Sequence, residues 1–215
     1  MNITLRDVSA FSILNYKIGT FLSLEGVSFF NFEFFYGLDT DNFAISDSLF
    51  DNTGLMHKEL AMRFLIIWEA FDVRTIQRST FINPCGGGCL ESFEASYSTG
   101  SLIRFKDCLI RGFTAFQGSN FLLLILGDAE IINTVFEGTN TPNGEPMKAS
   151  GNSIIRVSNS TFRNNTALTG GVFSIFSQST LEVENSVFEE NKALSSGGVI
   201  SAYTSGTLSI TNCTF

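Results

Sequence analysis

The chain has 215 residues, of which 44% are hydrophobic and 16% charged, and its formal net charge is −8. Its 13 Lys and Arg residues are scattered along the chain, which excludes the basic surface that nucleic-acid-binding proteins present. No apolar run reaches the ~18 residues of a membrane-spanning helix. The first residues, MNITLRDV, lack the basic and apolar regions of a secretory signal peptide, so we expect either a cytoplasmic protein or a mature or internal part of a longer one.

One short pattern recurs along the whole chain: apolar-x-apolar-x-(Asn/Asp)-small-x-Phe. A degenerate first copy, ITLRDVSA, ends at Ala10. The later copies, in chain order, are LSLEGVSF, FAISDSLF, RTIQRSTF, IRFKDCLI, EIINTVF, IRVSNSTF, LEVENSVF and LSITNCTF. Repeats that follow one another at intervals in the twenties are typical of solenoid proteins.

The apolar positions within each copy indicate a strand. They lie seven and five residues before the final Phe, and a spacing of two places both side chains on one face of a strand. The final aromatic residues should therefore lie over one another inside the solenoid, with Ile110 in the same place in one coil. The predicted stack consists of Phe29, Phe50, Phe81, Phe136, Phe162, Phe188 and Phe215.

The residue three places before each Phe predicts a sharp turn. Asn and Asp accept the left-handed backbone conformation, and their side chains in adjacent coils, ~4.8 Å apart, can bond to each other. We expect an inward-leaning ladder that is interrupted at Gly26 and Arg78. Earlier members are Asp7 and Asp47, and the continuous part consists of Asp107, Asn133, Asn159, Asn185 and Asn212.

A third strand precedes each copy. Its inward pairs should be Ile66/Trp68, Phe121/Leu123, Met147/Ala149, Phe173/Ile175 and Ile200/Ala202. Gly170-Gly171 and Gly197-Gly198 would supply the backbone conformations needed just before this strand. Three short strands in each coil of about 26 residues predict an all-β fold, a right-handed parallel β-helix formed by residues 1–215 as one domain.

Two longer intervals predict insertions, at residues 51–63 and 85–92, that protrude from the coils or cover them. The first contains His57, which is the only histidine. The second contains Cys85 and Cys89 around three glycines, which are candidates for a disulfide; two free thiols are the alternative. Cys108 and Cys213 share a small inward column four coils apart, ~19 Å, so they should stay free thiols.

The chain resembles the polymorphic outer membrane protein-like repeats of pectin-lyase-like surface proteins. The motifs that carry the resemblance are FRNN followed by GGVF and FEEN followed by GGVI, over about residues 130–215. The resemblance implies an extracellular adhesive or structural β-helix, and it implies no catalytic residues.

Catalytic, metal and cofactor sites are not predicted. GLDTDNFAI, with Asp39 and Asp41, is faintly similar to a segment of pectin-degrading hydrolases, which need two carboxylates across the scissile bond. The rest of that signature is missing, so a turn is the expected role. One His and four scattered Cys do not form a tetrahedral metal site.

Sequons for N-glycosylation occur at Asn2, Asn159, Asn164 and Asn212. Asn159 and Asn212 belong to the predicted inward-leaning ladder, where a glycan could not be attached. Asn164 lies in the turn after a Phe strand, so it is the best candidate if the protein is secreted by a eukaryote.

The outward positions of the third strand bear on partners. Tyr36, Ile67, Leu122 and Leu124 make the early coils apolar on both faces, which predicts a cover formed by an insertion or by another subunit. Later coils have Lys148, Ser174 and Ser201 there. The sequence starts on a coil strand and stops on a final Phe, so we expect a part of a longer β-helix or a unit that associates end to end or laterally into a filament.

These observations predict a non-enzymatic structural protein of the cell surface or extracellular space, such as a rigid stalk, a filament subunit or the shaft of an adhesin. The alternatives are a carbohydrate-binding adhesive domain and a polysaccharide lyase or hydrolase. Partners would be further coils, other copies or glycans, and neither nucleic acid nor membrane insertion is expected.

Overall fold

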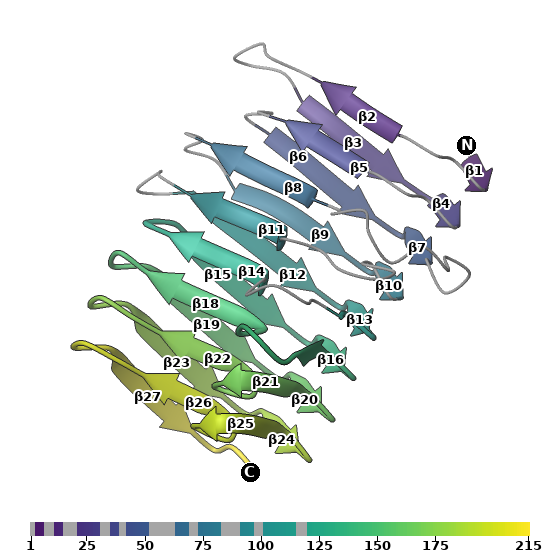
Figure 1. Ribbon diagram of the computed structural model, residues 1–215. Coiled ribbons are helices and arrows are strands. Elements are labelled where there is room, and N and C mark those ends of the chain that lie inside the picture. The colour runs from purple at the N-terminus through teal and green to yellow at the C-terminus, as the bar shows by residue number, and fades with distance from the viewer. Residues whose placement is uncertain are drawn as a thin grey trace.

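The computed structural model is a stack of parallel strands in which each coil lies on the one before it (Figure 1). The structure describes residues 3–6, 11–14, 21–30, 35–38, 42–51, 63–68, 73–82, 91–96, 101–114 and 120–215. In these residues every strand pairing is parallel, and no helix occurs. The parallel β-helix predicted from the sequence is therefore confirmed.

Two eight-stranded sheets run the length of the stack. Sheet 1 holds the first strand of each repeat: β3 (Phe21–Glu25), β6 (Asn42–Ser46), β9 (Val73–Gln77), β12 (Leu102–Lys106), β15 (Asp128–Ile132), β19 (Ile154–Ser158), β23 (Thr180–Glu184) and β27 (Thr207–Thr211). Sheet 2 holds the short Phe strands: β1 (Ile3–Arg6), β4 (Val27–Phe30), β7 (Leu49–Asp51), β10 (Thr80–Ile82), β13 (Leu109–Arg111), β16 (Val135–Glu137), β20 (Thr161–Arg163) and β24 (Val187–Glu189).

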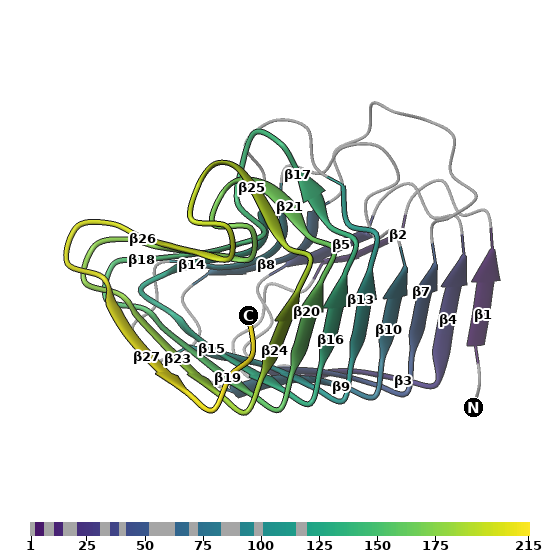
Figure 2. The same cartoon turned by 90° about the horizontal axis from the view of Figure 1, so that it is seen from below.

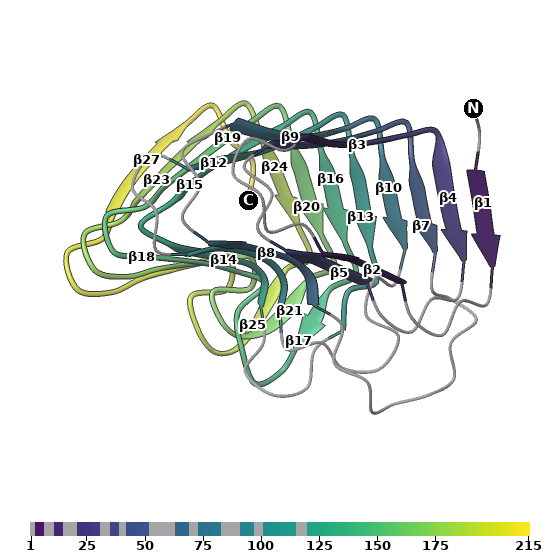
Figure 3. The ribbon, with the colours of Figure 1, turned by 90° about the horizontal axis from the view of Figure 1, so that it is seen from above.

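Smaller sheets close the coil. Sheet 3 consists of β8 (Arg63–Trp68), β11 (Glu91–Ser96), β14 (Asn120–Ile125), β18 (Met147–Ser150), β22 (Phe173–Ile175) and β26 (Ile200–Ala202), and β2 (Phe11–Leu14) pairs with β5 (Phe35–Leu38). Sheet 4 adds a fourth short strand to three coils: β17 (Asn140–Thr141), β21 (Thr166–Thr169) and β25 (Lys192–Ser196). Figures 2 and 3 show sheet 4 projecting at the corner between sheets 2 and 3.

The aromatic stack is confirmed. Phe29, Phe50 and Phe81 are paired in register, with ring centroids 5.1 and 4.9 Å apart. Ile110 takes the next place and pairs with Phe136. Phe136, Phe162 and Phe188 follow in register, and Phe215 stacks on Phe188 at 4.9 Å. Except for Phe215, which is 62% exposed, these rings are buried in one continuous core.

The first repeat differs in register from the prediction. Leu5 of β1 pairs with Phe29 of β4, so Leu5 occupies the Phe position that we expected for Ala10. The strand ITLR therefore belongs to sheet 2, although its alternation resembles that of a sheet 1 strand. Alternation with a period of two is the same in both sheets, and only the pairing partner distinguishes them.

Of the inward pair predicted in β14, Phe121 lies in the core, but the register of the strand differs by one residue from the prediction. Leu122 pairs with Met147 and Leu124 with Ala149, and both leucines are fully buried rather than outward. The turn from β14 to β15 is one residue shorter than the turn from β18 to β19, so counting back from the Phe gives the wrong face. The expected apolar outer face therefore loses Leu122 and Leu124. Through Ala95, Ile67 shares the register of Leu124.

Candidate functional site

The turns between sheets 1 and 2 have the left-handed backbone that the Asn and Asp pattern predicts. All seven described turn residues from Asp47 to Asn212, Arg78 included, have φ between 47° and 55°, and Gly26 has φ 63°. Their side chains, however, are not directed inward: Asn159 and Asn212 are exposed. Side-chain bonds join Asn133 to Asp107 at 2.6 Å and Asn212 to Asn185 at 2.7 Å, so the ladder exists on the outside of the turn.

Arg78 continues the outer ladder instead of interrupting it. Its Nε and Nη2 donate to the two carboxylate oxygens of Asp47 at 2.7 Å. The hydrogen bond from Arg78 lowers the pKa of Asp47, and the same bond raises the pKa of Arg78. A guanidinium can bridge one coil spacing to a carboxylate, which the sequence pattern of Asn and Asp alone does not indicate.

The column that points inward is the small one, two residues before the Phe. It consists of Val27, Ser48, Ser79, Cys108, Thr134, Ser160, Ser186 and Cys213. The Ser160 hydroxyl accepts the backbone N–H of Thr134 at 3.1 Å and donates to its own coil at the carbonyl of Ser158, 2.8 Å away. Ser186 repeats both bonds one coil later. These hydroxyls pair backbone groups that the tight turn would otherwise leave buried without a partner.

A second interior ladder follows the Phe strand. Asn165 is fully buried, and its Oδ1 accepts the backbone N–H and the hydroxyl of Thr139 at 3.0 and 2.8 Å. Its Nδ2 donates to the carbonyl of Phe136 and to Oδ1 of Asn191. Asn191 in turn donates to the carbonyl of Phe162 at 2.9 Å. The signal for this interior role is the Asn of the Phe-x-x-Asn motif, which recurs in both coils.

The two described cysteines are free thiols, as predicted. Cys108 is buried, and burial raises its pKa to about 11. A thiol that stays protonated at neutral pH is a poor nucleophile, so Cys108 serves the column by packing. The interior also contains a cation that the apolar columns do not predict: Arg74 is 2% exposed and lies in register with Ile103.

Charged side chains form columns on the outside of sheets 1 and 2. On sheet 1, Arg104 contacts Glu130 at 2.6 Å, and Arg156 contacts Glu182 at 3.0 Å. On sheet 2, Glu137 lies between Arg111 and Arg163. Burial by itself raises the pKa of Glu137, but the hydrogen bonds from Arg163 and Arg111 outweigh it and the net pKa is lowered.

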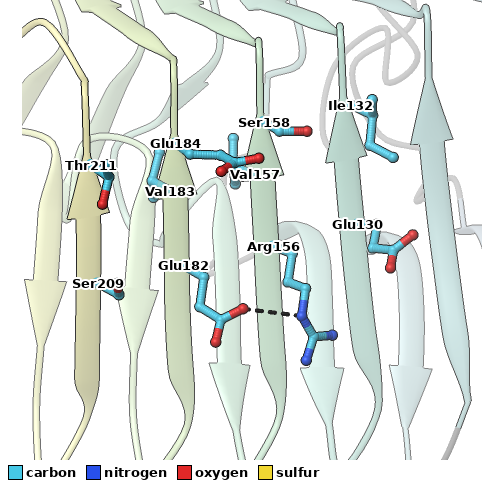
Figure 4. Close-up of a pocket in the computed structure, with 10 residues that line it drawn as sticks. All are labelled: Glu130, Ile132, Arg156, Val157, Ser158, Glu182, Val183, Glu184, Ser209 and Thr211. Atoms are coloured by element: carbon cyan, nitrogen blue, oxygen red, sulfur yellow. Dashed lines mark ion pairs between the residues drawn. The ribbon is translucent and has the colours of Figure 1, made fainter.

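The outer face of sheet 1 also holds a shallow hollow of about 420 Å³ (Figure 4). Ile132, Ser158, Glu184 and Thr211 surround it together with the Arg156–Glu182 ion pair. The carboxylates of Glu130 and Glu182 are both in ion pairs with arginines, and Glu184, which also lines the hollow, supplies a third carboxylate. Among the described residues no group of His, Cys, Asp or Glu could hold a metal ion.

A model of the family described as right handed beta helix region matches residues 33–215. The chain belongs to this family. Right-handed β-helix proteins are defined by the stacked coils described above, and the family itself does not decide between a scaffold and an enzyme. Neither the comparison with curated proteins nor that with solved structures found a match. In the part of the chain that the structure describes, no helix has the length and hydrophobicity of a membrane span.

The remaining predicted sites of this β-helix chain divide into two groups. Asn164 is exposed in a left-handed turn after β20, and Asn159 and Asn212 are exposed as well, although the Nδ2 of Asn212 donates to Asn185 in the outer ladder. Their glycosylation stays a prediction. Residues outside the described ranges are Asn2, Asp39, Asp41, His57, Cys85 and Cys89, with most of the predicted insertions 51–63 and 85–92. Asp51 belongs to β7, Arg63 begins β8 and Glu91 begins β11.

Proposed function

We propose that this protein is an extracellular or cell-surface structural β-helix, used as a rigid shaft without catalytic activity. The observation that carries the proposal is the continuity of the interior ladders. Ser160 and Ser186 each accept a backbone N–H from the preceding coil, Asn165 and Asn191 each donate to a carbonyl of the preceding coil, and the aromatic stack joins the same coils. The interior polar residues thus bond one coil to the next, and these bonds run along the direction in which a shaft is loaded.

The surface of the described coils supports the same function. The outer carboxylates of Glu130, Glu137 and Glu182 are in ion pairs, and the thiol of Cys108 is buried with a raised pKa. Ion-paired columns are suited to holding coils in register, whereas a hydrolase needs a carboxyl group available to donate a proton.

Single-molecule pulling on a chain that is held at both ends tests the mechanical part. We expect stepwise extension in which one 26-residue coil releases about 9 nm, because a fully extended residue spans about 3.5 Å. Gradual extension at low force, without such steps, would count against a shaft. Antibody labelling of intact source cells, lost after external protease treatment, tests the location.

Incubation with acidic and neutral polysaccharides tests the enzymatic alternative. We expect no new reducing ends and no unsaturated products after prolonged incubation of the purified protein. Reproducible cleavage that co-purifies with the protein would replace the scaffold function by a lyase or hydrolase function.

A further inference from the structure

Six charged side chains on the outer face of sheet 1 follow a simple rule. The first column, on β12, β15, β19 and β23, reads Arg104, Glu130, Arg156 and Glu182, so its sign alternates from coil to coil. Over the same four strands the second column begins with Lys106 and ends with Glu184, with Ile132 and Ser158 between them, and its next charge, Glu25, lies three strands before Lys106. Over these four strands, reading in the reverse direction replaces every charge in both columns by its opposite. The third outward column has a single charge, Asp128, whose carboxylate accepts the backbone N–H of Ile154 at 2.8 Å.

A surface with this property is complementary to its own reversed copy. A twofold axis parallel to the strands, between β15 and β19, brings β12 of one copy opposite β23 of the other and β15 opposite β19. Arg104 then faces Glu182 and Lys106 faces Glu184. In the middle, Glu130 faces Arg156, and the symmetry generates each of these contacts twice.

We propose that this face binds a second copy of the chain, with the two β-helices side by side and antiparallel. The shape of the face supports the same arrangement. The axis places Ile132 of the second copy opposite Ser158, and Ser158 lies in the hollow between the longer side chains of Ile132 and Glu184 (Figure 4). The small side chain of Ser158 thus leaves space for the larger side chain of Ile132 from the second copy, in the same region where opposite charges face each other.

The charges also select against the alternative arrangement. If the second copy lay parallel to the first, equal coils would face each other, with Arg104 near Arg104 and Glu182 near Glu182. Like charges in contact cost free energy, whereas ion pairs at an interface mainly fix orientation and register. The proposal goes beyond the shaft function, because a shaft could also act as a single β-helix.

The face is large enough for a weak interface. Six strands from β9 to β27 become opposed, and at ~4.8 Å per strand and about 17 Å of strand length they cover about 490 Å² on each copy. The total of about 1,000 Å² is at the lower limit for a specific interface, so we expect a dissociation constant of about 1 to 100 µM. At about 0.1 M salt the Debye length of about 10 Å screens the net charge of −8 while the contact pairs persist.

Sedimentation equilibrium of two charge-reversed variants tests the proposal. The first variant is Arg104→Glu with Lys106→Glu, and the second is Glu182→Lys with Glu184→Lys. Each variant alone opposes like charges, so we expect its dimer to weaken at least about tenfold. An equimolar mixture restores opposite charges at every contact, and its heterodimer should form within about threefold of the original affinity.

A control matched to the first variant changes the net charge by the same amount elsewhere, with Arg111→Glu on sheet 2 and Lys192→Glu on sheet 4. This control should dimerise like the original protein, and thermal melting should show that all variants are folded. A protein that remains monomeric at about 500 µM in 0.1 M salt would overturn the proposal. Dimerisation that the control abolishes, or that mixing the two variants fails to restore, would overturn it as well and would place the interface on another face.

Discussion

Asn165 shows how one polar side chain can be required inside an apolar stack. It is fully buried, and its amide satisfies groups of Thr139, Phe136 and Asn191. An apolar replacement of similar size would leave the Thr139 N–H and the Phe136 carbonyl without this partner. A buried polar group without a hydrogen-bond partner costs the free energy of its lost hydration. This cost exceeds the net stabilisation that the hydrogen bond provides when it is formed.

We therefore expect Asn165→Ala to lower the free energy of unfolding by about 2 to 3 kcal/mol. Chemical denaturation followed by circular dichroism measures this directly. Asn140→Ala is the control, since Asn140 is an exposed asparagine in the neighbouring sheet 4, and its change should stay within about 0.5 kcal/mol. Equal effects of the two substitutions would show that the interior ladder adds nothing to stability.

Glu137 gives sheet 2 a dependence on pH. Its pKa in the folded protein is lowered by Arg163 and Arg111 despite partial burial, while the ordinary value is 4.5. The folded state thus binds the proton less readily than the unfolded chain. The stabilisation is complete above about pH 5 to 6, declines once the pH falls below the ordinary value, and is lost below the folded pKa.

Glu137→Gln should accordingly be less stable than the original protein at pH 7, by no more than about 1 kcal/mol because both arginines are exposed. The difference should shrink as the pH falls toward about 3. Urea unfolding at several pH values measures it, with Glu189→Gln, from the exposed end of the same column, as control. A difference that grows in acid would mean that folding raises the pKa of Glu137 instead of lowering it.

At the scale of the element, the turn before β22 depends on two glycines for different reasons. Gly170 has φ 51°, and a Cβ there would lie 2.0 Å from the carbonyl oxygen of Phe173. At Gly171 the obstacle belongs to the next coil, because a Cβ would lie 2.1 Å from the carbonyl oxygen of Gly198. The second glycine is thus needed for the close approach of two coils.

Gly171→Ala should lower the free energy of unfolding by at least about 2 kcal/mol, because backbone must move to admit the methyl group. Gly198 occupies the same place one coil later and has nothing within 4 Å of the added Cβ, so Gly198→Ala is a matched control with an expected change within about 0.5 kcal/mol. Thermal and denaturant unfolding would measure both variants. Two equally mild substitutions would mean that the coils can separate here without cost.

At the scale of the whole molecule, charge alternates by coil on sheets 1 and 2 in phase. The coil of Arg104 and Arg111 is positive, the next has Glu130 and Glu137, and the pattern continues with Arg156 and Arg163 and with Glu182 and Glu189. The repeating unit of charge is therefore two coils, although the backbone repeats after one.

Two insertion variants distinguish the two-coil repeat of charge from the one-coil repeat of the backbone. Duplicating residues 137–162 adds one coil and brings like charges together, Arg156 with its copy and Glu137 with its copy. Duplicating residues 137–188 adds two coils and keeps the alternation everywhere. We expect both proteins to fold. The free energy of unfolding gained per inserted coil should be about 1 kcal/mol lower for the one-coil insertion, since each like-charged pair costs a few tenths of a kcal/mol or more.

Raising the salt concentration to about 0.5 M should remove most of that deficit, because exposed charges are then screened. Differential scanning calorimetry of both insertions at two salt concentrations measures this. The contradicting result would be an equal gain in stability per inserted coil for the two proteins at low salt. It would show that the charge of a coil does not contribute to register.

The sequence predicted the interior aromatic column well because its members are identical and equally spaced. Phe136, Phe162 and Phe188 lie 26 residues apart, and a shared spacing with shared chemistry leaves one way to stack them. The prediction failed where coil length varies. The turn between β14 and β15 lacks one residue, which moved Leu122 and Leu124 to the inside.

By itself the sequence determined the period, the parallel β-helix and the left-handed turns, because these follow from spacing and from the backbone preferences of Asn, Asp and Gly. The sequence also predicted the small inward column, to which Ser160 belongs, whereas only the tertiary structure decided that the Asn159 column faces outward and that Asn165 is inside. Ser160 and Asn165 are inside and Asn159 is outside, and all three follow from which backbone groups of the neighbouring coil need a hydrogen-bond partner. Whether a backbone group needs such a partner depends on the coils above and below it. The sequence of a single strand therefore cannot indicate it.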